Sequence, residues 1–186
     1  MEALMFRRIR RAAFQANPIN PIQMQSLAKA NQLVASGHPG QAAPLFASLA
    51  SELETTAHPR RAANLHAQAA HAYADSNNEQ PALDQARRAL TLFIQSQMVN
   101  RTPVFFGNIT RKFTNKGMKS AADTITAEFG PKIGPMAAQP TSNAAHQGQL
   151  PTNCAKCGAP IHKSDANWVD DQTIECDFCG SLIRSE

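Results

Sequence analysis

Two short cysteine motifs near the C-terminal end constrain the fold of this chain most. Cys154 and Cys157 enclose two residues, Cys176 and Cys179 do the same, a glycine follows each pair, and 18 residues separate the pairs. Two intervening residues let both sulfurs reach one ion from a single tight turn, and glycine permits the left-handed backbone that directs amide N–H groups at thiolates. Four thiolates form a closed tetrahedral shell with no open position for substrate water. The motifs therefore predict a structural metal site with these four cysteines as its ligands.

The spacing and composition resemble a zinc ribbon over about residues 152–184. The resemblance implies one structural Zn²⁺ and short strands containing the apolar residues between the motifs, among them Trp168 and Ile174. A core this small needs the metal in order to hold some 33 residues together. We therefore expect a zinc ribbon over 152–186.

Other chemistries use the same residue types. Iron in a rubredoxin-like site takes the same four sulfurs, and sequence alone does not distinguish it from zinc. Two disulfides need an oxidising compartment, and no export signal is evident. A redox dithiol normally has one such motif beside a strand–helix unit, and here there are two. His162 lies beside a complete set of four ligands, so it is expected on the surface.

A repeat with a period of 40 residues organises the first 129 positions. Its first copy is Ala30, Leu33, Gly37, Ala42 and Phe46, and the second and third copies are Ala70, Tyr73, Asn77, Ala82, Ala86 and Thr110, Phe113, Gly117, Ala122, Thr126. Each unit indicates a helix, a tight turn and a second helix, with a left-handed residue at the Gly or Asn position. The small residue in the second helix lets two helices approach closely. The prediction is a mainly α chain with no sheet in this part.

The repeat resembles the tetratricopeptide repeat, over about residues 22–129. The resemblance implies an α-solenoid of about three stacked antiparallel helix pairs, with a groove for a protein or peptide partner. The period exceeds that family's usual ~34 residues, and the extra residues fit a longer second helix or linker. A plain bundle of six or seven helices is the alternative. The predicted domains are a basic helix at 1–17, the repeat domain at 18–129, a flexible linker at 130–151 and the ribbon.

The N-terminal residues predict an amphipathic helix with apolar side chains on one face. Its basic residues are Arg7, Arg8, Arg10 and Arg11. Such a helix packs on the first repeat, lies peripherally on an anionic membrane or contacts nucleic acid. A secretory signal is not expected, because no apolar core follows the arginines.

Charge divides the chain unevenly. The whole chain has a net charge of +4, but residues 152–186 carry three basic and six acidic side chains, a net −3, which leaves +7 for the rest. An acidic ribbon with thiolate ligands is unsuited to phosphate contacts, so protein binding or docking on the basic body is expected instead. The basic run Arg111, Lys112, Lys116 and Lys119 is the better candidate for an anionic partner, with a solvated helix face as the alternative.

These features favour a binding protein over an enzyme. No phosphate-binding glycine loop, paired carboxylates or nucleophile elbow is evident, and no apolar run reaches the ~18 residues that span a bilayer. We expect a cytoplasmic, bacterial protein–protein interaction adaptor with a structural zinc ribbon. The alternative is a nucleic-acid-associated factor, related to transcription or translation, that uses the N-terminal helix and the third repeat.

Overall fold

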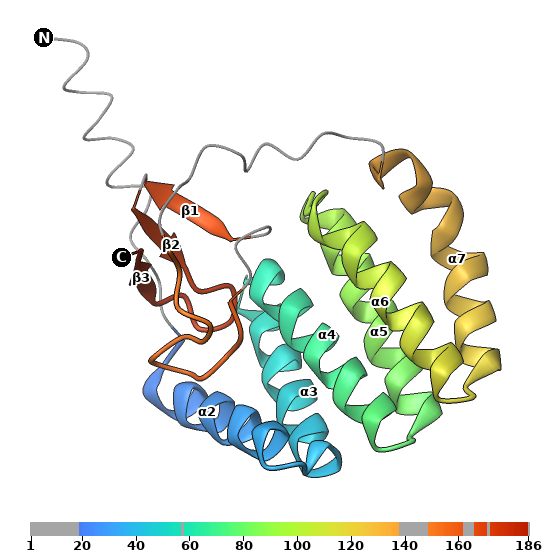
Figure 1. Cartoon of the computed structure of the whole chain (residues 1–186), viewed down its shortest axis with the longest axis horizontal. Coiled ribbons are helices and arrows are strands. Elements are labelled where there is room, and N and C mark those ends of the chain that lie inside the picture. The colour runs from blue at the N-terminus through green and yellow to red at the C-terminus, as the bar shows by residue number, and fades with distance from the viewer. Residues whose placement is uncertain (1–18, 57, 138–148, 162–165, 171, 186) are drawn as a thin grey trace, which may run out of the picture.

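The computed structural model describes residues 19–56, 58–137, 149–161, 166–170 and 172–185 (Figure 1). Its helices are α2 (Pro21–Ala35), α3 (Pro39–Thr55), α4 (Pro59–Asp75), α5 (Glu79–Gln95), α6 (Arg101–Asn115) and α7 (Lys119–Ala137). Its strands are β1 (Asn167–Asp170), β2 (Thr173–Glu175) and β3 (Leu182–Arg184). The predicted basic helix at 1–17, His162 and positions 138–148 of the predicted linker lie outside the described residues.

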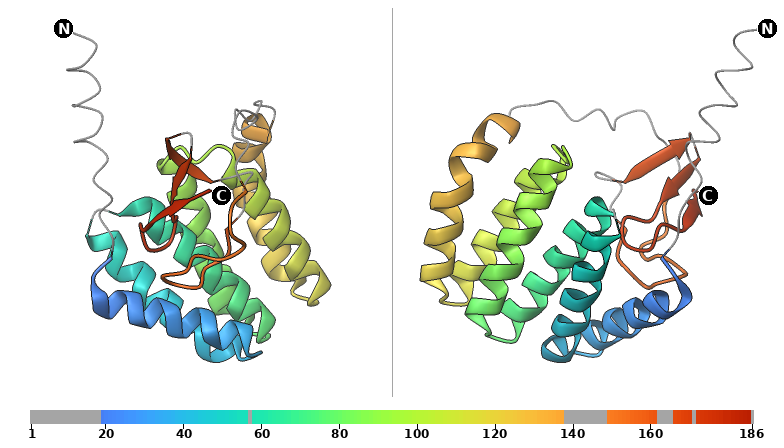
Figure 2. Two further views of the ribbon diagram at one scale, coloured as in Figure 1. Left: turned by 60° about the vertical axis from the view of Figure 1, so that its left-hand side comes forward. Right: turned by 180° about the vertical axis from the view of Figure 1, so that it is seen from behind.

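The helices pack in sequence order, each against the next, and successive helices run in opposite directions (Figures 1 and 2). Mainly helical architecture was predicted and is confirmed for the described residues. The predicted helical domain ends at 129, whereas α7 continues to Ala137. Phe129 and Ile133 lie four positions apart and are both buried, so the apolar face of this helix extends past the predicted boundary.

Left-handed residues end four of these helices. The backbone φ is +81° at Gly37, +60° at Asn77 and +76° at Gly117, the three predicted positions, and +53° at Gln97, which the repeat did not predict. In each turn the following N–H bonds to the carbonyl five residues back. These bonds measure 2.8–2.9 Å and join His38 to Leu33, Asn78 to Tyr73, Met98 to Phe93 and Met118 to Phe113.

The turn recurs every 20 residues rather than every 40. The His58 N–H bonds to the Leu53 carbonyl at 3.1 Å in the same pattern, midway between the turns at Gly37 and Asn77. Among the described residues, the N–H to carbonyl bond that closes these turns therefore recurs every 20 residues, which is half the period seen in the sequence.

Small side chains lie where neighbouring helices approach one another. Ala42 and Ala82 are fully buried and Ala122 nearly so, as the repeat predicted. Of the larger residues expected between the helices, Phe113 is fully buried, whereas Leu33 and Tyr73 are only half-buried.

The C-terminal segment folds as a cysteine module, by which we mean the described residues from 149 onward. Its three strands form an antiparallel sheet in the order β1-β2-β3, with buried Ile174 in the middle strand opposite Trp168 and Ile183. The four cysteines and Phe178 belong to the same apolar cluster as Leu27 of α2 and Leu65 of α4. The module therefore shares a core with α2–α4, beside which it lies in Figure 2.

Candidate metal centre and basic groove

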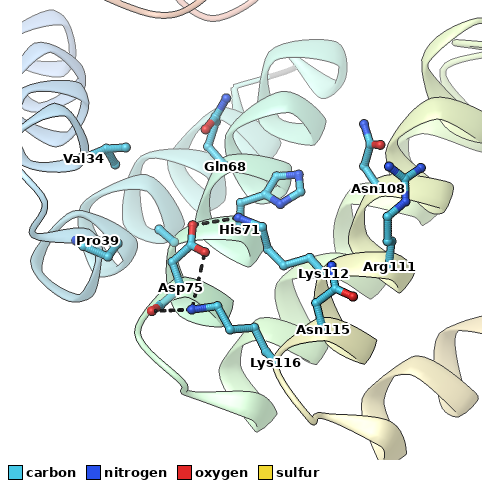
Figure 3. Close-up of a pocket in the computed structure, with 11 residues that line it drawn as sticks. Val34, Pro39, Gln68, His71, Asp75, Asn108, Arg111, Lys112, Asn115 and Lys116 are labelled. Atoms are coloured by element: carbon cyan, nitrogen blue, oxygen red, sulfur yellow. Dashed lines mark hydrogen bonds and ion pairs between the residues drawn. The ribbon is translucent and has the colours of Figure 1, made fainter.

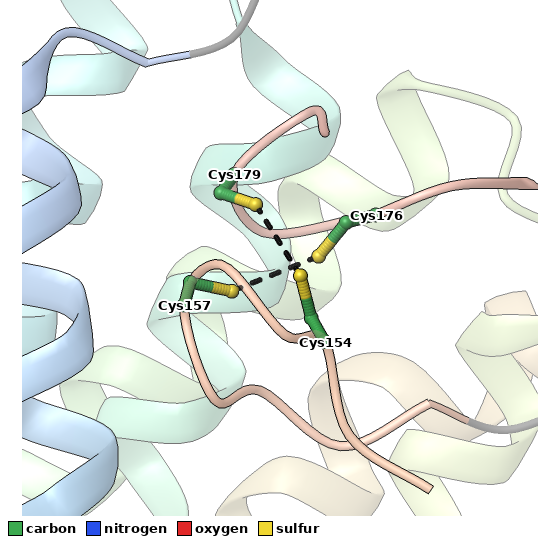
Figure 4. A group of neighbouring side chains, drawn as sticks. All are labelled: Cys154, Cys157, Cys176 and Cys179. Atoms are coloured by element: carbon green, nitrogen blue, oxygen red, sulfur yellow. Dashed lines mark hydrogen bonds between the residues drawn. The ribbon is translucent and has the colours of Figure 1, made fainter. Parts of the chain in front are cut away.

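The four predicted ligand cysteines converge from two loops of the cysteine module (Figure 4). Their sulfurs all lie within 4.8 Å of one another, and all four side chains are buried. The two loops have matching backbones. The Gly158 N–H bonds to the Cys154 carbonyl and the Gly180 N–H to the Cys176 carbonyl, each at 2.8 Å, and both glycines have a φ of +74°. The predicted left-handed glycines are thus in place.

The spacing of the sulfurs fits one tetrahedral ion. Sulfurs about 2.3 Å from a central metal lie about 3.8 Å apart in a regular tetrahedron. The distances from Cys154 Sγ to Cys179 Sγ and from Cys157 Sγ to Cys176 Sγ are both 3.8 Å. All four cysteines are free thiols, not disulfides. The cluster can therefore hold one metal ion in a closed shell.

The sulfurs affect one another's protonation. Hydrogen bonding, chiefly with Cys157, lowers the pKa of the Cys154 thiol, whereas hydrogen bonding, chiefly with Cys154, raises the pKa of Cys157. Four thiolates this close repel one another, so the group retains protons until a cation compensates the charge.

Side chains of the helical body hold the second cysteine loop, which runs from Cys176 to Cys179, and the last residue of β2 before it. The Arg61 Nη2 lies 2.5 Å from the Glu175 carboxylate, and the Arg101 Nη2 lies 3.1 Å from that of Asp177. The Asn64 side chain donates to the Asp177 carbonyl at 3.0 Å. The expected docking of the acidic C-terminal part on the basic body is therefore present.

The first cysteine loop and the start of the helical body add uncharged contacts. The Asn31 side chain of α2 donates to the Cys157 carbonyl at 2.8 Å, and the Ile19 N–H donates to the Cys179 carbonyl at 3.1 Å. Arg61 also lies directly against Gly180, where a Cβ atom would stand 2.1 Å from its Nη2. The module thus contacts α2, α4 and α6, the first helix of each pair.

The same three helices, together with the first residue of α3, line a groove of about 650 Å³ next to the module, which we call the basic groove (Figure 3). Its lining residues are Val34, Pro39, Gln68, His71, Ala72, Asp75, Asn108, Arg111, Lys112, Asn115 and Lys116. Three cations and one carboxylate leave it positive. Lys112 Nζ lies 2.7 Å from the Asp75 carboxylate and Lys116 Nζ 3.9 Å from it, whereas no carboxylate among the described residues pairs with exposed Arg111.

The structure separates the predicted anion-binding residues. It brings Arg111, Lys112 and Lys116 to the basic groove, but Lys119 begins α7 and does not line it. The four N-terminal arginines, Arg7, Arg8, Arg10 and Arg11, lie outside the described residues.

His71 of α4 lies in the middle of the groove lining (Figure 3). Its ring stands edge-on to Phe105, with 5.4 Å between the ring centroids. Burial, and after it the charge of Lys112, lowers the pKa of His71 to about 4. The imidazole is therefore neutral at physiological pH.

Sequence reasoning missed the docking residues Asn31, Arg61, Asn64 and Arg101. No motif distinguishes them, because they come from three helices and act on backbone carbonyls and single carboxylates. The opposite net charges of the two parts of the chain were the only available signal, and they indicated the contact without naming its residues.

No helix in the described part of the chain is both long and apolar enough to cross a bilayer. Comparison with models of protein families, with curated proteins and with solved structures finds no match.

Proposed function

We propose that this protein is a protein–protein interaction adaptor whose basic groove takes an acidic segment of a partner. One observation carries the proposal. The face made by α2, α4 and α6 already holds an acidic segment of the same chain, through Arg61 with Glu175 and Arg101 with Asp177. Beside it the face leaves an open groove with an excess of positive charge. Charge complementarity of this kind favours an acidic partner.

The helical body, on this proposal, is a solenoid similar to tetratricopeptide repeats. The recurring left-handed turns at Gly37, Asn77 and Gly117 and the buried alanines between helices support this view. A stack of equivalent units presents one continuous face to a partner, because corresponding helices repeat along it.

The metal, on this proposal, is a structural zinc held by Cys154, Cys157, Cys176 and Cys179. The all-sulfur shell and the 3.8 Å edges suit Zn²⁺, and the burial of all four ligands leaves no position for catalytic water. Elemental analysis of the purified protein should give close to one zinc per chain, and Cys176→Ser should abolish it. Iron at the same stoichiometry, or a folded module without metal, would reject the zinc assignment.

Binding of a fluorescein-labelled oligoglutamate peptide at low salt tests the groove. We expect Arg111→Glu to weaken binding about tenfold or more, because it reverses the charge of the groove cation that no carboxylate among the described residues pairs with. Lys119→Glu is the matched control, since Lys119 is also exposed and basic but lies outside the groove. Equal losses in the two variants would mean that the net charge of the body, and not the groove, attracts the peptide.

Nucleic acid is tested in the same assay. Duplex DNA or RNA that displaces the peptide, with binding that falls steeply between ~50 and ~200 mM salt, would replace the adaptor proposal with the nucleic-acid one. No competition at low salt would support the adaptor.

A further inference from the structure

A second, smaller pocket of about 140 Å³ lies between the cysteine module and the helical body. The module contributes Pro160 and Phe178, and α4 and α6 contribute apolar side chains that include Ala67, Val104 and Phe105. We call this the apolar pocket. Small-molecule sites usually measure about 300–1,000 Å³, so this pocket has room for a single side chain rather than for a cofactor.

The apolar pocket continues into the basic groove. Gln68, His71 and Asn108 line both, so the two spaces meet along α4 and α6. Val104 is 57% exposed, one of four large apolar side chains that the described part of the chain leaves in solvent. An apolar side chain from outside would cover Val104 and remove it from water.

We propose that the apolar pocket and the basic groove form one composite site, which takes an acidic partner segment carrying an aliphatic side chain. The aliphatic group enters between Phe178 and Val104, and the carboxylates lie along Arg111, Lys112 and Lys116. This inference rests on the proposed function and specifies the chemistry of the partner. His71 lines both the apolar pocket and the basic groove. Its neutral ring can therefore lie between the aliphatic group of the partner and its carboxylates.

The composite site also makes recognition depend on the cysteine module. Phe178 lies between Cys176 and Cys179 in the second cysteine loop, so the loop that holds the metal ligands also positions one wall of the pocket. The basic groove contains no module residue. The two parts of the site should therefore respond to different treatments. Salt should weaken the contacts in the basic groove, and disruption of the module should weaken those in the apolar pocket.

A peptide series separates the two ends. The probes are fluorescein-labelled oligoglutamate peptides with one leucine at each successive position, and the same peptides with serine in its place. With the intact protein, one leucine position should bind at least about tenfold more tightly than its serine counterpart, which is the gain expected from burying an aliphatic side chain.

Two surface variants locate the effect. Val104→Ser should remove most of the preference for leucine over serine at that position. Ile22→Ser is the matched control, because Ile22 is 77% exposed on α2 and lines neither space. Helical circular dichroism of both variants checks that they fold.

The outcomes distinguish this inference from the proposed function. Equal binding of leucine and serine peptides at every position would overturn the composite site and leave the acidic-partner proposal intact. Failure of all the peptides to bind at low salt would overturn both. A leucine preference that survives Val104→Ser would show that the apolar contact lies elsewhere and would also reject the inference.

Discussion

At the residue scale, the two glycines of the cysteine loops have the same backbone but different neighbours. Both have a φ of +74°, yet a Cβ at Gly158 would meet only the Asn31 Cβ, at 3.5 Å, whereas one at Gly180 would stand 2.1 Å from the Arg61 guanidinium. The left-handed backbone costs a non-glycine residue about 1–2 kcal/mol at either site. Only at Gly180 must the substitution also displace a partly buried ion pair.

We predict that Gly180→Ala destabilises the protein more than Gly158→Ala does. The difference should be about 1–3 kcal/mol, because Arg61 moves away from Glu175 and leaves a partly buried carboxylate without its partner. Denaturant unfolding of the two metal-loaded variants measures this difference. Equal losses of stability would mean that the Arg61 contact contributes nothing beyond the backbone strain.

A second residue-scale prediction concerns pH and His71. Burial, followed by Lys112, lowers the pKa of His71 from 6.5 to about 4, and Asp75 opposes this shift. Between these two pH values the unfolded chain binds a proton that the folded chain does not, so the free energy of unfolding falls as the pH falls through this window. His71→Gln should remove up to about 3 kcal/mol of that fall, since one pKa unit corresponds to about 1.36 kcal/mol.

Urea unfolding of the parent and His71→Gln proteins between pH 7 and pH 4 is the measurement. His38→Gln is the control, because His38 is exposed at the start of α3. A pH dependence that is the same in the parent and in His71→Gln would show that His71 does not carry the effect.

At the element scale, the turns at the ends of the helices contribute to stability as well as the packed faces. Gly107 lies inside α6 and Gly117 lies in the turn after it, with a φ of +76°, and a Cβ at either position would meet nothing within 4 Å. Both sites therefore have room for a methyl group, and they differ only in backbone conformation, which is helical at Gly107 and left-handed at Gly117. The same substitution should have opposite effects at them.

We predict that Gly107→Ala raises the free energy of unfolding by about 0.5–1 kcal/mol, because alanine has the higher helix propensity. Gly117→Ala should lower it by about 1–2 kcal/mol, because alanine must adopt the left-handed conformation. Thermal and denaturant unfolding measure both changes. Effects of the same sign would mean that the turn at Gly117 relaxes out of its left-handed conformation.

The element scale is also where the sequence was most informative. Glycine and asparagine reveal left-handed positions, so the turns at 37, 77 and 117 could be predicted. The turn at Gln97 could not be predicted, because nothing about glutamine indicates a positive φ, so the sequence shows only the 40-residue spacing of the other three turns. The four cysteines were predictable as a cluster for a similar reason, since their spacing alone fixes their geometry.

At the scale of the whole molecule, the described residues form two apolar clusters. One combines α2, α3 and part of α4 with the cysteine module, and the other joins α4 to α5, α6 and α7. The cysteine side chains are members of the first cluster. Loss of the module should therefore affect the two ends of the helical stack unequally.

We predict that replacing a ligand, as in Cys176→Ser, increases amide hydrogen exchange in α2 and α3 more than in α6 and α7. The first cluster loses packing partners when the module detaches, whereas the second keeps all of its own. Exchange followed by mass spectrometry gives the protection of each helix. Ser185→Ala, a change in the same module away from the sulfurs, is the control. A uniform loss of protection would mean that the helices unfold as one unit.

Docking of the module was the part of the fold that sequence could indicate but not specify. The charge difference predicted an attraction, yet its geometry depends on Asn31 and Asn64 reaching backbone carbonyls, and such bonds leave no pattern in a sequence. The basic groove was partly predictable, because Arg111, Lys112 and Lys116 are close in sequence. His71 and Asp75 come from another helix and required the structure.

The contacts between the module and the body span the chain. Asn31 and Cys157 are 126 positions apart, and Arg61 and Glu175 are 114 apart. A ribosome releases the helices long before it releases the second cysteine pair, so α4 emerges before the module residues that Arg61 and Asn64 contact in the folded chain. The face made by α2, α4 and α6 can therefore form on the nascent chain before the module exists to cover part of it. An acidic partner present during synthesis would meet a larger basic surface than the finished protein offers.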